Sequence, residues 1–220
     1  MISSDYGRER LLGNNVEPEK FSLIDILLIF VIIALLINVF VQTVWLSPVK
    51  VEGPSMRQTL QNEDWLFMDK LKKPERGDVV VFKRSETVNY IKRIIALPGD
   101  EIYSEDGTVY IKIKGSESFV EVNDEHSYYS AGRPSGTYLN DDLDDIPRTV
   151  LGDGEMYVMG DNRWGSKDSR DPTVGKVEIS TILGIVPDWA IDRKENLKGY
   201  FEFLEKVNNF IDGLTGKKEK

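Results

Sequence analysis

One long apolar segment constrains this chain more than any other feature. Residues 26–41 read ILLIFVIIALLINVFV, and Asn38 is the single strongly polar side chain among them. Continued to Leu46, the segment as a helix is about 30 Å long, which is the thickness of the hydrocarbon core of a bilayer. The sequence therefore predicts a helix that crosses a membrane once.

The segment fits an uncleaved anchor better than a cleaved leader. A cleaved leader has a shorter apolar core and small residues before its cleavage site, whereas this segment continues into TVWLSPVKVEG. Trp45 suits the membrane–water boundary. Basic residues are slightly more frequent before the segment than close behind it: Arg8, Arg10 and Lys20 against Lys50 and Arg57. This bias predicts a cytoplasmic N-terminus and an extracytoplasmic C-terminal part.

Composition narrows the classes of function. The chain has a net charge of -9 and an isoelectric point near 4.8, which argues against a nucleic-acid partner. There is no cysteine, so disulfides, zinc–thiolate sites and thiol nucleophiles are excluded. The only histidine, His126, lies in a polar, turn-rich segment where a solvated side chain is expected. The acidic run 141–145 lacks the spacing of a calcium loop, so we expect no metal and no cofactor.

The chain beyond the apolar segment has the pattern of an antiparallel β domain. Residues 77–83 (GDVVVFK) and 155–160 (EMYVMG) are short apolar runs of the kind found in strands buried on both faces. Residues 100–115 alternate apolar and polar side chains around Asp106–Gly107, which predicts a hairpin. The expected fold class is mainly β, with one N-terminal transmembrane helix and a short C-terminal amphipathic helix.

The C-terminal helix is expected from apolar residues at helical spacing: Tyr200, Leu204, Val207, Ile211 and Leu214. Its acidic residues favour packing on its own domain or on a partner rather than on a membrane. The predicted organisation is a cytoplasmic segment, a membrane anchor, an extracytoplasmic β domain with a polar insertion, and a helix with a charged tail. Their boundaries are 1–21, 22–46, 47–196 with the insertion at 115–150, and 197–220.

Two residues stand out as candidates for chemistry. In VNYIKRIIALPGDEI (88–102), a strand would place Lys92 and Arg93 on opposite, mainly apolar faces. Burial would lower the pKa of Lys92 and make it a candidate base, although a paired or snorkelling lysine is the simpler interpretation. Ser55 follows Gly53–Pro54, and N–H groups near such a turn can serve as an oxyanion hole. Taken alone, Ser55 is better explained as an ordinary loop or capping serine.

The segment 157–171 (YVMGDNRWGSKDSRD) has the composition of a tightly hydrogen-bonded loop. It offers the hydroxyls of Ser166 and Ser169, and the carboxylates of Asp161 and Asp168 as partners for nearby arginines. By itself it could be only an elaborate turn.

Together these segments resemble type I signal peptidases, the membrane-bound serine proteases that remove signal peptides from exported proteins. The resemblance is carried by the apolar anchor and by PSMRQTL, RGDVVVF, YIKRIIALPGDEI and MGDNRWGSKDSR, which occur in the family's order across most of residues 51–186. It implies a largely antiparallel β structure with a more variable inserted region. It also implies preprotein signal peptides and the lipid bilayer as partners, with the secretion translocon as a further candidate.

The resemblance implies a mechanism in which Ser55 is the nucleophile and Lys92 is the general base. The supporting residues that it implies are Ser166 to orient the amine, Gly53 in the oxyanion region, Met56 as a substrate contact, and the ion pairs Asp161–Arg93 and Asp168–Arg170. Cleavage is expected after small residues at the first and third positions before the cut bond.

Two positions depart from the family's pattern. Gln58 stands where the family commonly has proline, and Gly53 stands where some members have a hydroxyl residue. Oxyanion stabilisation would then fall to main-chain N–H groups, notably that of Ser55. The alternatives are a related Ser-Lys peptidase dedicated to a narrow substrate, and a noncatalytic membrane-anchored domain that binds peptides.

Overall fold

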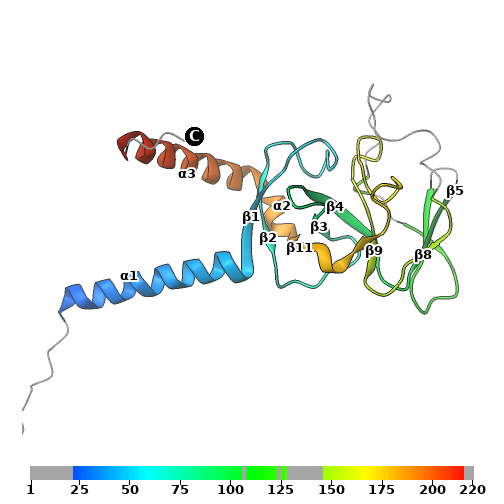
Figure 1. Ribbon diagram of the computed structural model, residues 1–220, viewed down its shortest axis with the longest axis horizontal. Coiled ribbons are helices and arrows are strands. Elements are labelled where there is room, and N and C mark those ends of the chain that lie inside the picture. Colours follow the sequence, from blue (N-terminus) through cyan, green and yellow to red (C-terminus); the bar gives the residue numbers. More distant parts are fainter. Residues whose placement is uncertain (1–21, 106–107, 123–124, 128–145, 216–220) are drawn as a thin grey trace, which may run out of the picture. The chain divides into compact units, whose positions relative to one another are not determined.

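The computed structural model in Figure 1 describes most of the chain, namely residues 22–105, 108–122, 125–127 and 146–215. Several predicted features lie outside the described residues: the segment 1–21, the turn at Asp106–Gly107, most of the polar insertion with its acidic run 141–145, and the tail 216–220. The chain divides into two compact units, Met1–Phe40 and Val41–Lys220.

The first unit contains the apolar helix α1, Leu23–Phe40. Its N-terminus is capped reciprocally, because the Ser22 backbone donates to the Asp25 carboxylate and the Asp25 backbone donates to the Ser22 hydroxyl. The chain then forms a π-helical turn, η1, Val41–Trp45. The segment Leu23–Trp45 has a mean hydropathy of 3.1 and, among the described residues, is the one segment long and apolar enough to cross a membrane.

A seven-stranded antiparallel sheet forms the main body of the second unit, in the order β1-β2-β11-β3-β4-β9-β10 (Figure 1). Its strands are β1 Leu46–Lys50, β2 Trp65–Asp69, β3 Val79–Lys83, β4 Asn89–Ala96, β9 Glu155–Met159, β10 Val177–Glu178 and β11 Ile182–Val186, with the short 3-10 helix η3 Ile179–Thr181 before β11. The strands predicted at 77–83 and 155–160 are thereby confirmed. Pro48 is tolerated because β1 lies at the edge of the sheet.

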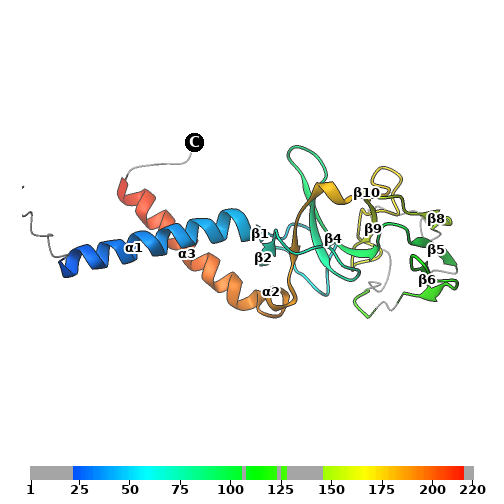
Figure 2. The same ribbon diagram turned by 90° about the horizontal axis from the view of Figure 1, so that it is seen from below.

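A smaller antiparallel sheet has the order β7-β6-β5-β8. Its strands are β5 Glu101–Glu105, β6 Thr108–Lys112, β7 Val120–Glu121 and β8 Thr149–Val150. The predicted hairpin is confirmed, because β5 and β6 pair from Glu101↔Lys112 to Glu105↔Thr108. Figure 2 shows β5, β6 and β8 grouped together beyond β9, at the end of the unit opposite to β1 and β2.

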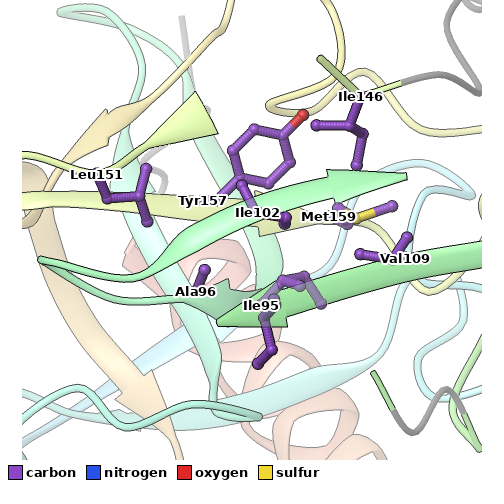
Figure 3. Close-up of a cluster of buried hydrophobic side chains, with 9 residues drawn as sticks. Ile95, Ala96, Ile102, Val109, Ile146, Leu151, Tyr157 and Met159 are labelled. Atoms are coloured by element: carbon purple, nitrogen blue, oxygen red, sulfur yellow. The ribbon is translucent and has the colours of Figure 1, made fainter. Parts of the chain in front are cut away.

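A shared core joins the two sheets. Ile95 and Tyr157 from the larger sheet pack with Ile102 and Val109 from the smaller one (Figure 3), and none of the four is more than 7% exposed. Burying apolar side chains of this size stabilises a fold by about 1.5–3 kcal/mol each. The two sheets therefore support each other.

β3 is buried on both faces, as its sequence predicted. Val79 and Val81 belong to one apolar cluster, and Val80 and Phe82 belong to another. β4 pairs with β3 on one side and with β9 on the other, and Lys92 of β4 lies opposite Val80. The lysine is thus placed in a central strand whose surroundings are mainly apolar.

Two helices follow β11: α2, Asp188–Asp192, and α3, Lys194–Thr215. The predicted C-terminal helix is confirmed and begins at Lys194, three residues before the expected start. Its N-terminal half packs on β2, where the Phe201 ring lies 4.6 Å from that of Trp65 and 5.5 Å from that of Phe67. Figures 1 and 2 both show the other half of α3 extending away from the sheet.

The two helices also cover an apolar cluster beneath residues 51–60, which we call the turn cluster. It contains Met56 and Leu60 together with Ala190 of α2, and Leu197 of α3 packs against it. The C-terminal helices and the chain around Ser55 therefore share one core.

Candidate active site

Ser55 lies in a tight turn, residues 53–60, which we call the Ser55 turn. Met56 and Leu60 point inward and are 1% and 0% exposed, so they anchor the turn on the turn cluster. The backbone N–H of Leu60 donates to the Met56 carbonyl at 2.8 Å, which closes one helical turn. Ser55 itself is half-buried and faces the rim of a groove.

β4 brings Lys92 to this serine. The Lys92 amine lies 2.8 Å from Ser55 Oγ and donates to the Ile91 carbonyl at 2.9 Å. Lys92 is only 4% exposed, and its amine lies 5.0 Å from the centre of the Tyr90 ring. The two residues that the sequence singled out are therefore in direct hydrogen-bonding contact.

Burial changes the acidity of the lysine. Removal from water disfavours the ammonium form and lowers the pKa of Lys92 to about 8, from 10.5. The carboxylates of Asp168 and Asp161 oppose this shift, whereas the Arg170 charge adds to it. At pH 7 about one amine in ten is then neutral, which is several hundred times the fraction of an ordinary lysine.

A buried ion pair links β4 to the loop that follows β9. Arg93 Nε and Nη2 donate to the two carboxylate oxygens of Asp161 at 2.8 and 2.7 Å, which is bidentate geometry. Asp161 also accepts a hydrogen bond from the Thr59 hydroxyl, and Arg93 donates to the Gly77 carbonyl at 2.7 Å. Asp161 therefore ties the Ser55 turn to the strand that carries Lys92.

The second predicted pair, Asp168 with Arg170, is buried in the same loop. Arg170 Nε and Nη2 both lie 2.9 Å from the Asp168 carboxylate, which also accepts the Gly160 backbone N–H at 2.8 Å. Burial raises the pKa of Asp168, but the Arg170 charge and the hydrogen bonds outweigh it and hold the pKa below its ordinary value. Asp168 is therefore a buried carboxylate near Lys92.

Three other residues named from the sequence lie outside this network of contacts with Lys92. The Ser166 hydroxyl is fully buried beside the Asp168 carboxylate, whose pKa it helps to lower, and no hydrogen bond joins it to the Lys92 amine. Met56 borders the groove but is buried in the turn cluster rather than offered to a ligand. His126 is exposed, with Glu125 3.9 Å away, and takes no part in the site.

Several residues that hold the site were missed from the sequence. Asn162 fixes the main chain around Ser55, because its backbone N–H donates to the Ser55 carbonyl at 3.0 Å and its amide donates to the Pro54 carbonyl at 3.1 Å. Gly160 lies so close that a Cβ there would overlap the Ser55 carbonyl oxygen and the Ser166 hydroxyl. A glycine at the end of an apolar strand was the only available signal.

Gln58 has an unusual backbone. Its φ is 95°, in the left-handed region that side chains other than glycine rarely adopt. Proline, with φ fixed near −65°, cannot take this conformation. Gln58 therefore has a backbone conformation that the proline common in the family could not adopt.

The groove beside Ser55 has a volume of about 470 Å³. One wall is formed by residues 49–56 and the other by residues 87–92, with Gly165 and Lys167 at its side. A larger hollow of about 750 Å³ lies beside Phe119 on the smaller sheet, and its lining includes none of the candidate site residues. Chemistry rather than size therefore identifies the candidate site.

A hydroxyl in contact with a buried amine of lowered pKa, at an open groove, is an arrangement typical of hydrolases that act through a covalent intermediate. Comparison with known proteins agrees with this class. The family model described as "Signal peptidase, peptidase S26" matches residues 23–188, and the chain belongs to this family of serine peptidases.

Individual relatives are similar over most of their length. Signal peptidase I of Bacillus licheniformis is 34% identical over 178 residues, which is 78% of this chain and 89% of the relative. Signal peptidase IB of Staphylococcus aureus is 32% identical over 166 residues, 72% of this chain and 85% of the relative. A crystal structure of a signal peptidase I from Enterococcus faecalis is 26% identical, with a TM-score of 0.39, and covers 53% of this chain and 98% of its own.

Proposed function

We propose that this protein is a membrane-anchored endopeptidase that removes N-terminal signal peptides from exported preproteins, with Ser55 as nucleophile and Lys92 as general base. The observation that carries the proposal is the 2.8 Å contact between the Lys92 amine and Ser55 Oγ in a buried environment. Family membership and relatives named as signal peptidase I support the substrate class.

The proposed reaction has two halves. The neutral Lys92 amine accepts the Ser55 hydroxyl proton while Ser55 Oγ attacks the carbonyl carbon of the scissile bond. The ammonium returns the proton to the departing amine as the peptide bond breaks, which leaves an acyl-enzyme. Water then attacks the ester, Lys92 takes a proton from it, and Ser55 recovers its hydrogen as the acid product leaves.

The negative charge on the carbonyl oxygen needs a donor in the tetrahedral intermediate. The Gly53 N–H is engaged with the Asn62 side chain at 2.9 Å, and Gly53 has no side chain to contribute. We assign this role to the Ser55 N–H. An extended substrate between the two walls of the groove would bind by backbone pairing, with small side chains next to the cut bond.

The chain around Trp45 supports a location of the groove near a bilayer. The candidate span ends at Trp45, whose indole N–H donates to Asp69 at 3.1 Å, and β1 begins at the next residue. β1 covers about 17 Å, so the turn with Ser55 lies a short reach from the end of the span. We propose a cytoplasmic N-terminus and an extracytoplasmic β domain, which places the groove where a membrane-embedded signal peptide emerges.

The test is cleavage of synthetic preproteins by the purified full chain in detergent or lipid. Ser55→Ala and Lys92→Met should each lower kcat by about 10³-fold or more, because each removes a reacting group. For the native chain, kcat/KM should rise with pH through an apparent pKa near 8, which is the value that burial gives Lys92.

Lys83→Met is the matched control, because Lys83 is an exposed lysine on the neighbouring strand β3 and is paired with Glu86. It should cleave normally. Full activity of Lys92→Met near neutral pH would refute the mechanism. A panel of unrelated preproteins then tests breadth, and cleavage of only one of them would identify a dedicated peptidase.

A further inference from the structure

We propose that Lys194, the first residue of α3, is a positioning residue for the turn that carries Ser55. The inference rests on the proposed function, because it assigns Lys194 a part in holding the proposed nucleophile. α3 lies beyond residues 23–188, the part of the chain that matches the family. The inference therefore concerns a residue outside the part of the chain that matches the family model.

The Ser55 turn contains a strained residue that needs restraint. Gln58 lies three residues after Ser55 with φ at 95°, and its side chain is exposed, so packing of that side chain does not hold the conformation. A strained backbone of this kind persists only where the surrounding structure over-determines it. The restraint must come from the neighbours of Gln58.

Thr59, the next residue, is held at three points. Its backbone N–H donates to the Met56 carbonyl at 3.1 Å, and its hydroxyl donates to Asp161. Its carbonyl oxygen accepts a hydrogen bond from Lys194 Nζ at 2.6 Å. The first two contacts involve the turn itself and the loop after β9, and Lys194 adds a third restraint from α3.

Lys194 is itself well fixed. Its amine is 4.0 Å from the buried Asp64 carboxylate, which accepts the Gln61 backbone N–H at 2.7 Å. Leu197, one turn further along α3, packs against the turn cluster under Met56. α3 therefore places the Lys194 amine at the end of the Ser55 turn, where Asp64 is its counter-ion.

The consequence for the reaction is geometric. Met56 follows Ser55 directly, and its carbonyl accepts the N–H groups of both Thr59 and Leu60. A shift of Thr59 is thus passed to Met56 and then to Ser55, whose Oγ must stay in contact with Lys92. Misplacement of a reacting group by about 1 Å can cost about 100-fold in rate.

The first experiment uses the full chain and one position. Lys194→Met should lower kcat about tenfold or more with KM changed less than about twofold, because the groove remains while the nucleophile is displaced. Lys194→Arg should recover most of the activity, since it restores a charged donor. Lys198→Met, one turn further along α3 and outside the Ser55 turn, should leave kcat unchanged.

Hydrogen exchange gives a readout that does not depend on catalysis. In Lys194→Met the amides of Thr59 and Leu60 should exchange faster, while those of β4 around Lys92 should keep their native rates. If Ser55→Ala still cleaves substrate, the proposed function fails, but the exchange rates still decide whether Lys194 holds the turn. Native exchange in Lys194→Met overturns the proposal.

A double-mutant cycle with Gln58→Gly separates positioning from general stability. Glycine adopts a positive φ freely, so the tether should matter less once the strain is gone. We compare the fold-loss in kcat that Lys194→Met causes in the two backgrounds. It should be at least about threefold smaller with Gln58→Gly than in the native chain. Equal losses in both backgrounds, or native kcat for Lys194→Met, overturn the proposal.

Discussion

The two residues of the proposed dyad are held in different ways. Lys92 lies in β4, whose backbone pairs with β3 on one side and β9 on the other, so the position of its main chain is a property of the whole sheet. Ser55 lies in a turn held by a few hydrogen bonds: Asn162 donates to the Ser55 and Pro54 carbonyls, the neighbouring Asp161 accepts from Thr59, and Lys194 of α3 donates to the Thr59 carbonyl.

This difference separates stability from catalysis. A change that disturbs the lysine's surroundings acts on a buried core and should lower the free energy of unfolding. A change that loosens the serine's turn acts on a few hydrogen bonds outside the strand pairing and should lower kcat while the sheet stays folded. We call the contacts that hold Lys92 the lysine's arm and the contacts that hold Ser55 the serine's arm. The ion pair Arg93–Asp161 belongs to both arms, because Asp161 also accepts a hydrogen bond from Thr59.

Among changes that keep both Ser55 and Lys92, the largest effect is expected at Gly160, which lies against the Ser55 turn. Gly160→Ala would place a Cβ against the Ser55 carbonyl and the Ser166 hydroxyl, so the Ser55 turn and the loop after β9 must separate. We expect kcat to fall by about 100-fold or more, measured on a synthetic preprotein. Gly199→Ala is the matched control: the space around Gly199 in α3 is open, so this change should stabilise the fold by about 0.5–1 kcal/mol. Native kcat for Gly160→Ala would contradict the close approach.

Asp168→Asn tests the lysine's arm. It removes one partner of a buried ion pair, so the free energy of unfolding at pH 7 should fall by about 3–5 kcal/mol, measured by denaturant titration. The pKa of Asp168 is lowered in the fold, so its stabilisation is present above the ordinary carboxyl pKa and is lost as the pH falls through the lowered value. The difference between variant and native chain should therefore shrink in acid.

The same variant should move the pH–rate profile. The Asp168 charge raises the pKa of Lys92, so its removal should shift the rising limb of kcat/KM below its native midpoint near 8. Glu86→Gln removes an exposed pair instead and should change neither quantity by a measurable amount. A shift of the limb to higher pH would show that Asp168 does not act on Lys92.

The lysine's arm could be predicted from sequence and much of the serine's arm could not. Apolar runs and period-two alternation are local signals. They predicted β3, β9 and the strand that carries Lys92 and Arg93. The bond from Lys194 to Thr59 joins residues 135 positions apart, and no local pattern specifies which helix end will meet which carbonyl. The close approach of Gly160 is hidden for the same reason.

The placement of Met56 was not visible in the sequence either. The resemblance implied that it contacts substrate; it lines the groove beside Ser55, but its side chain is 1% exposed and packs in the turn cluster. The family resemblance joined Ser55 to Lys92, which neither local pattern could do. It did not anticipate that the Ser166 hydroxyl would lack a bond to the lysine in this chain.

The smallest expected effect, at Gln58, tests whether the serine's turn stores strain. Gln58→Gly removes the cost of a left-handed backbone at an exposed position, so it should stabilise the fold by about 1 kcal/mol and leave kcat within about twofold. Gln58→Pro forces φ near −65° and should lower kcat, because the chain between Met56 and Thr59 must then take another path. Thermal unfolding and preprotein cleavage measure the two effects. If Gln58→Pro keeps the native kcat, the left-handed backbone at Gln58 is not needed to place Ser55. The position of Ser55 would then be as insensitive to this residue as the position of Lys92.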